Sequence, residues 1–186
     1  MSRLNFDSNR IEDFAIKVIQ KSYDNLYEQY VWHGKDDNFD FTSSNDKFAL
    51  EVASIIPLNE LNVIQYEKAL DKGKKPDARK VVDACINDKG EMLTYYGGSM
   101  SEIRSAVLKM ISQKELKRKR RSKADVIYEL CLIIDDGGLF NSSRDFDFII
   151  RSNILNTTGF SRLFIITCSN FYIVEGEKIE EKERII

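Results

Sequence analysis

Residues 38–56, NFDFTSSNDKFALEVASII, predict a β-hairpin early in the chain. A short aromatic run opens the stretch, and the polar residues 42–46 (TSSND) are typical of a turn. Residues 48–56 are rich in apolar residues that favour strands. Pro57 follows and ends the predicted strand, because proline cannot donate a hydrogen bond to a sheet.

The second predicted strand carries an acidic residue in an unusual setting. Because side chains alternate between the two faces of a strand, Glu51 lies on the same face as Ala49 and Ala53. A carboxylate among small uncharged neighbours requires a partner, a metal ion or a substrate. Asp40, on the other side of the predicted turn, is the nearest candidate partner.

This pair of acids resembles the active-site motif of the PD-(D/E)XK, or restriction-endonuclease-like, nucleases. In that family an aspartate on one strand is followed on the next strand by the sequence Glu-x-Lys. Here Asp40 is followed by Glu51-Val52-Ala53, so both acids match and Ala53 stands where the family has lysine. Phe39 also replaces the proline that precedes the family's aspartate.

The resemblance implies a metal-dependent nuclease in which Asp40 and Glu51 bind Mg²⁺ or Mn²⁺. It also implies that Glu12, on a helix predicted for residues 11–31, is a further metal ligand. The family can supply the missing lysine from the helix after the hairpin, which points to Lys68 in the helix predicted for residues 58–72. The alternative for Glu12 and for Lys68 is a solvated position on the outer face of a helix.

A basic run is the second strong feature of the sequence. Residues 114–123, KELKRKRRSK, contain seven basic residues and one acidic residue, whereas the whole chain has a net charge of −2. Clustered lysine and arginine residues neutralise phosphates and release counterions, so the run predicts nucleic-acid binding. The residues concerned are Lys114, Lys117, Arg118, Lys119, Arg120, Arg121 and Lys123. A solvated helix end, or contact with an acidic protein partner, would give the same pattern.

Composition excludes several classes of protein and site. The 186 residues are 42% hydrophobic and 31% charged, which is typical of one globular domain with an adequate core. The three cysteines form no CxxC pair, the only histidine is His33, and no phosphate-binding glycine loop occurs. The sequence contains neither a long apolar segment nor an apolar signal core, so we expect a cytoplasmic protein that does not cross membranes.

The order of predicted elements favours an α/β fold with a three-layer sandwich, in which helices flank a central mixed sheet. The hairpin and its flanking helices are followed by an irregular insertion at 74–98, a helix at 99–119, a buried strand at 128–134, a helix at 142–155, strands at 160–166 and 171–174, and a charged tail or edge strand at 175–186. The restriction-endonuclease-like core has a similar order of elements.

Three functions are compatible with these features. The first is a metal-dependent nuclease that cleaves phosphodiester bonds at the Asp40–Glu51 pair. The second is a catalytically inactive nucleic-acid-binding module on a nuclease-like fold. The third is a protein-interaction module, in which the two acids are structural and the basic run contacts an acidic partner. The sequence does not distinguish DNA from RNA as the nucleic acid.

Overall fold

The computed structural model describes residues 11–23, 39–43, 45–55, 66, 68–74, 84–86, 92–95, 99–135 and 139–185. Contacts divide the chain into two compact units. The sheet unit comprises residues 1–55 and 107–186, and the insert unit comprises residues 56–106.

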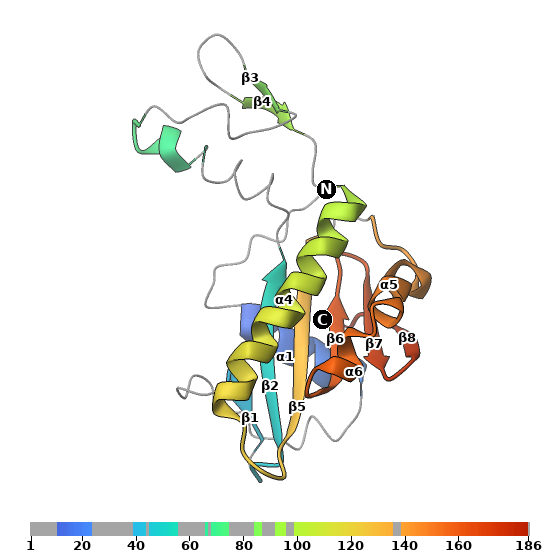
Figure 1. Ribbon diagram of the computed structural model, residues 1–186. Coiled ribbons are helices and arrows are strands. Elements are labelled where there is room, and N and C mark those ends of the chain that lie inside the picture. Colours follow the sequence, from blue (N-terminus) through green and yellow to red (C-terminus); the bar gives the residue numbers. More distant parts are fainter. Residues whose placement is uncertain are drawn as a thin grey trace. The chain divides into compact units, whose positions relative to one another are not determined.

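A six-stranded mixed sheet forms the centre of the sheet unit (Figure 1). Its strands, in spatial order, are β1 (Phe41–Thr42), β2 (Phe48–Ile55), β5 (Ile127–Ile134), β6 (Phe160–Ile166), β7 (Asn170–Glu175) and β8 (Lys178–Glu183). The three strands β2, β5 and β6 are parallel to one another, and every other neighbouring pair is antiparallel. The predicted α/β class with a mixed sheet is therefore confirmed.

Helices lie on both faces of this sheet. Helix α1 (Ile11–Ser22) buries an apolar stripe that includes Val18 and Ile19 against the face that carries Leu50 and Val52. Helix α4 (Met100–Arg121) crosses in front of β2 and β5 in Figure 1, and its side chains contact the opposite face, to which Glu51 points. Strand β5 is buried at all but its first position, as expected for a strand covered on both faces.

The remaining elements are short. Between β5 and β6 the chain forms a 3-10 helix, η2 (Ser143–Phe146), and two short helices, α5 (Asp147–Arg151) and α6 (Ile154–Thr157). Within the insert unit, β3 (Ala84–Ile86) and β4 (Met92–Tyr95) form a two-stranded antiparallel sheet, so part of the segment predicted to be irregular is regular. Among the described residues, no helix is both long enough and apolar enough to cross a membrane.

The charged C-terminal segment is part of the sheet. Strand β8 pairs with β7 along its whole length, which agrees with the edge strand that was one of the two alternatives for residues 175–186. The strand contains two lysines and three glutamates besides Ile179, and most of its side chains are exposed. Charged residues on an edge strand oppose pairing with a further strand from another molecule.

A clamp of two charged side chains fixes the C-terminal half of α4 over the sheet. Arg118 donates two parallel hydrogen bonds to the buried carboxylate of Glu115, with distances of 2.7 and 2.8 Å. The backbone N–H of Gly159, at the start of β6, donates to the same carboxylate at 3.1 Å. The guanidinium of Arg118 lies 5.2 Å from the ring centroid of Tyr128 on β5. Helix, β5 and β6 are thus joined at one point, which we call the Glu115–Arg118 clamp.

Gly159 is required by the close approach of this clamp. A Cβ atom at position 159 would lie 2.2 Å from Cζ of Arg118, which is far inside van der Waals contact. The guanidinium cannot simply rotate away, because both its hydrogen bonds to Glu115 and its contact with Tyr128 hold it there.

We expect Gly159→Ala to lower the free energy of unfolding by about 1–3 kcal/mol, because the added methyl group displaces Arg118 from Glu115. Denaturant unfolding of the purified protein measures this loss. In an Arg118→Ala background the same substitution should cost much less, since the clashing group is gone. Equal losses in both backgrounds would show that the guanidinium is not what Gly159 accommodates.

The clamp also makes stability depend on pH. Burial raises the pKa of Glu115, but the hydrogen bonds from Arg118 and Gly159 and the charges of Arg118 and Lys119 outweigh it and hold the pKa below its ordinary value of 4.5. A carboxyl group with a lowered pKa stabilises the folded state above its unfolded pKa and loses this contribution as the pH falls through its folded pKa.

We therefore expect the free energy of unfolding of the wild type to fall below about pH 4.5 more steeply than that of Glu115→Gln. Urea titrations between about pH 6 and about pH 3 measure the two slopes. Glu183→Gln, an exposed change of equal charge on β8, serves as the control. If Glu115→Gln and Glu183→Gln decline in parallel, the clamp does not contribute to the acid sensitivity.

Candidate functional site

Asp40 and Glu51 are brought together by the hairpin of β1 and β2. Phe41 pairs with Leu50 and Thr42 pairs with Ala49, so the same register places Asp40 opposite Glu51 on one face. The carboxylate of Asp40 accepts a hydrogen bond of 2.6 Å from the backbone N–H of Val52. The side chain of Asp40 therefore adds a hydrogen bond between the two strands just before the first residue of β1.

Glu51 is the most deeply buried member of the site. Its side chain is 0% exposed, and on the same sheet face its strand neighbours are Ala49 and Ala53. Small neighbours leave space above Glu51 for long side chains from another element. A buried carboxylate is strongly unfavourable unless cations or hydrogen-bond donors compensate its charge.

Lys114 of α4 provides a cation that joins both acids. Its Nζ atom donates hydrogen bonds to Oε2 of Glu51 at 2.6 Å and to the backbone carbonyl of Val52 at 3.1 Å. The same nitrogen lies 3.9 Å from Oδ2 of Asp40. Both carboxylates thus approach a single ammonium group, and the expectation that they share one side of the hairpin is confirmed.

Lys117 provides a second cation on the other oxygen of Glu51. Its Nζ lies 2.5 Å from Oε1 of Glu51. The contact is a charge contact without hydrogen-bond geometry, and Oε1 accepts no hydrogen bond within the described part of the chain. The side chain of Lys117 is 33% exposed, compared with 19% for Lys114, so Lys117 is the lysine more accessible to solvent.

The spacing along α4 explains why these lysines point inward. Val107, Ile111 and Lys114 follow one another at intervals of four and three residues, which places them along one face of the helix. Val107 and Ile111 are fully buried, and Arg118 continues the same face. The long apolar stems of the lysines extend this buried face while their ammonium groups reach Glu51.

The structure divides the basic run into two groups by what their charges face, and nucleic-acid binding by the seven residues stays a prediction. Lys114 and Lys117 contact Glu51, and Arg118 is held in the clamp. The charges of these three side chains are directed at buried carboxylates of the protein itself. The exposed group comprises Lys119, Arg120, Arg121 and Lys123. Of these, Lys119 also lies 3.6 Å from Glu115.

The other predicted site residues have different outcomes. Helix α1 packs on the sheet face opposite to Glu51, so the structure does not bring Glu12 to the acid pair. Lys68 belongs to the insert unit and is exposed there, and its role stays a prediction. The lysines that the structure does place beside Glu51 are Lys114 and Lys117, which the sequence pattern linked only to nucleic-acid binding.

A second buried carboxylate lies on the α1 face of the sheet. Glu129 is 0% exposed and accepts a hydrogen bond of 2.7 Å from Arg162, which also bonds Glu175 at 3.1 Å. The guanidinium of Arg162 lies 5.0 Å from the ring centroid of Tyr23. This network ties β5, β6 and β7 to the residue that follows α1, and its only signal in the sequence is a charged residue within an apolar strand.

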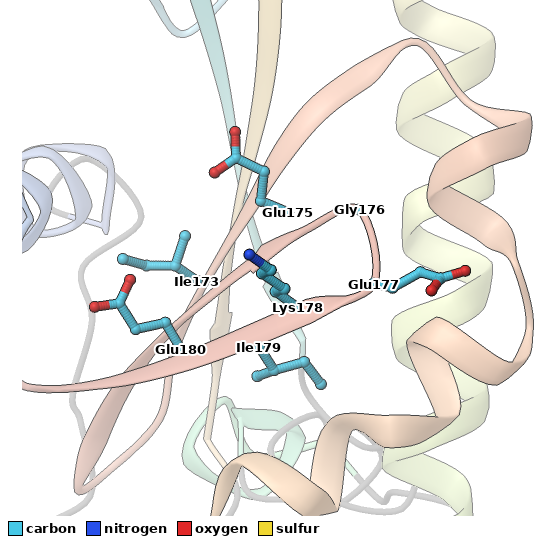
Figure 2. Close-up of a pocket in the computed structure, with 7 residues that line it drawn as sticks. All are labelled: Ile173, Glu175, Gly176, Glu177, Lys178, Ile179 and Glu180. Carbon is cyan, nitrogen blue, oxygen red and sulfur yellow. The ribbon is translucent and has the colours of Figure 1, made fainter.

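An open hollow of about 780 Å³ lies at the hairpin of β7 and β8, on the edge of the sheet opposite to β1. Figure 2 shows Glu175, Lys178 and Glu180 on one side of this hairpin with Ile173, while Glu177 projects away from them. Oppositely charged side chains line the hollow together, and no buried acid points into it among the residues that Figure 2 labels. It offers less chemistry than the Asp40–Glu51 site.

Within the described ranges, no group of three or more histidine, cysteine, aspartate or glutamate residues is arranged to hold a metal ion. Oxygen donors nevertheless converge at the acid pair, where two carboxylates and the carbonyl of Val52 surround one ammonium nitrogen. These are the ligand types that Mg²⁺ accepts, together with water molecules.

Comparisons with protein-family models, with curated proteins and with solved structures find no match to this chain. What the site can do chemically therefore follows from its own geometry.

Proposed function

We propose that the protein is a metal-dependent nuclease that hydrolyses phosphodiester bonds on a restriction-endonuclease-like fold. Asp40 and Glu51 would hold Mg²⁺ or Mn²⁺, and Lys114 would take the role of the lysine that Ala53 replaces in the motif. The observation that carries the proposal is the approach of one ammonium group to both acids, at 2.6 Å from Glu51 and 3.9 Å from Asp40.

The donor set fits a hard divalent cation. Asp40, Glu51 and the carbonyl of Val52 offer oxygen atoms from three separate groups around one position. Mg²⁺ uses one or two protein carboxylates and keeps several water molecules or substrate oxygens as its other ligands. When bound, such an ion lowers the pKa of a coordinated water and offsets the charge of the scissile phosphate.

The chain's own residues would do the remaining work. Asp40 is oriented by the N–H of Val52, so its carboxylate is held in place before any ligand arrives. Lys114 and Lys117 supply positive charge beside the position of a phosphate. Charge placed in advance where negative charge develops lowers the barrier to phosphoryl transfer.

The exposed group of the basic run supports a polyanionic substrate. Lys119, Arg120, Arg121 and Lys123 follow Lys114 and Lys117 on the same helix and the turn after it. Their exposed side chains can neutralise phosphates at some distance from the reacting one, without reading base sequence. The order of helix, hairpin, helix and parallel strand in the sheet unit is also that of the resembled fold.

A nucleic-acid-binding module without turnover is the second candidate. It is favoured by the complete burial of Glu51 and by the two lysines that already compensate its charge. In that case the pair of acids and the lysines are a structural ion-pair network that anchors α4 to the sheet.

We expect the wild type to cleave nucleic acid with Mg²⁺ or Mn²⁺, and Lys114→Ala to lower the rate about 10²–10³-fold, because it removes a preorganised positive charge. Lys68→Ala tests the rival lysine and should leave the rate nearly unchanged. Glu51→Gln should abolish cleavage and weaken metal binding. Cleavage rates on mixed DNA and RNA substrates, with calorimetric metal titrations, measure these effects.

The same assays separate the alternatives. A strong loss of rate with Lys68→Ala and none with Lys114→Ala would assign the missing lysine to the insert unit. Wild-type protein that binds nucleic acid but cleaves none of the substrates, with or without metal, would favour the binding module.

We expect the exposed basic group to determine the salt dependence of nucleic-acid binding. Replacing Lys119, Arg120 and Lys123 together by alanine should reduce the slope of log K against log salt by about 0.9 for each duplex phosphate that these side chains neutralise. The matched control replaces Lys72, Lys74 and Lys178, three exposed lysines outside the run, and changes the net charge equally. Titrations by fluorescence anisotropy at several salt concentrations measure both slopes, and equal slopes would rule out the run as the binding surface.

A further inference from the structure

We propose that Lys114 is a tethered cation that occupies the divalent-metal position of the metal-free protein. A metal ion then binds only when the ammonium group of Lys114 leaves. This proposal deepens the proposed function, since it concerns the regulation of the same site, and it rests on the cation site rather than on turnover.

Three oxygen atoms from three groups converge on Nζ of Lys114: Oε2 of Glu51 at 2.6 Å, the carbonyl oxygen of Val52 at 3.1 Å and Oδ2 of Asp40 at 3.9 Å. The ammonium donates hydrogen bonds to the first two oxygens and forms a longer ion pair with the third, so its positive charge serves all three groups as that of a metal ion would. A metal ion and the ammonium group cannot occupy this position together.

Glu51 is completely buried, and its carboxylate requires a positive charge whether or not a metal ion is present. One oxygen of Glu51 accepts its hydrogen bond from Lys114, whereas Oε1 accepts none among the described residues. Lys117 lies 2.5 Å from Oε1, so a metal ion that replaces Lys114 beside Oε2 would leave a positive charge at each oxygen of Glu51.

Lys117 contacts Glu51 without occupying the point where the three oxygen atoms converge. Its Nζ lies 2.5 Å from Oε1 of Glu51, about as close as Lys114 lies to Oε2. Of the two lysines, only Lys114 also contacts the carbonyl of Val52 and Asp40 in the described structure. The two lysines thus give Glu51 similar charge compensation but differ in whether they occupy the point where the oxygens converge.

Departure of Lys114 does not require α4 to move. The next residue, Glu115, belongs to the clamp with Arg118 and Gly159, which holds the helix backbone over β5 and β6. The lysine side chain can rotate about its own bonds and move its ammonium to the exposed side of the site, where a substrate phosphate would bind, because 19% of the side chain is already exposed. The switch is therefore a change of side-chain rotamer on a fixed helix.

Calorimetric titration of Mn²⁺ into the full-length wild type, Lys114→Met and Lys117→Met tests the proposal. If Lys114 blocks the site, Lys114→Met binds Mn²⁺ at least about tenfold more tightly than the wild type, since no ammonium has to be displaced. Lys117→Met removes a charge at the same distance from Glu51, so any tightening that it causes measures charge repulsion alone. Lys119→Met, an exposed change on the same helix, controls for net charge.

Thermal unfolding gives a second measurement that does not depend on activity. Without metal, Lys114→Met should unfold at a lower temperature than the wild type, and saturating Mn²⁺ should raise its Tm by more than it raises that of the wild type. Circular dichroism establishes that each variant is folded. If Lys114→Met does not fold, Lys114→Gln, which keeps a hydrogen-bond donor without the charge, takes its place.

The outcomes separate this proposal from nuclease activity. Equal tightening by Lys114→Met and Lys117→Met overturns the blocking role and leaves the nuclease proposal standing. Absence of Mn²⁺ binding in every variant overturns the proposal, because the three oxygens then form no metal site. Tight binding by Lys114→Met, combined with no binding and no cleavage by the wild type, supports the tethered cation and contradicts the proposed function.

Discussion

The carboxylate of Glu51, buried in the middle of a sheet face, is the constraint on which the arrangement of α4 depends. An uncompensated charge at that depth would cost several kcal/mol, so the fold must deliver cations to it. Two lysines on α4 do so, and they also span from the helix to the hairpin of β1 and β2. The first two strands, the long helix and the acid pair are therefore linked through the contacts of Glu51 with Lys114 and Lys117.

The buried carboxylate of Glu115, which belongs to α4 itself, fixes the helix to the sheet at a second point. Glu51 belongs to the sheet and draws lysines from the helix, whereas Glu115 belongs to the helix and accepts a hydrogen bond from Gly159 at the start of β6. The two contacts are adjacent along α4, since Lys114 precedes Glu115. Together they hold the helix backbone rigidly while they leave the lysine side chains able to rotate, and such a combination suits a site that must accept a ligand without a movement of the fold.

The contacts of Glu51 and Glu115 with lysine and arginine side chains change how the positive charge of residues 114–123 is interpreted. In the sequence, residues 114–123 form a strongly basic run, and this pattern suggests a uniform surface for phosphate. In the structure, Lys114, Lys117 and Arg118 neutralise buried acids, and only the last part of the run is exposed. A net local charge therefore overstates the positive potential that a polyanion would meet, because charges paired inside the protein are not available to it.

Local patterns in the sequence predicted strands β2, β5, β6 and β7, helix α4, and the placement of Asp40 and Glu51 on either side of one turn, but they did not predict β3 and β4. Those features follow from alternation of side chains along a strand and from the three-four spacing along a helix, which are properties of neighbouring residues. Only the tertiary structure decided which lysine reaches Glu51, because that depends on how a helix more than fifty residues away crosses the sheet. The tertiary structure also decided that α1, which carries Glu12, packs against the sheet face of Leu50 and Val52, opposite to the face of Glu51. A sequence pattern records which face of an element is apolar, but it does not record which element that face will meet.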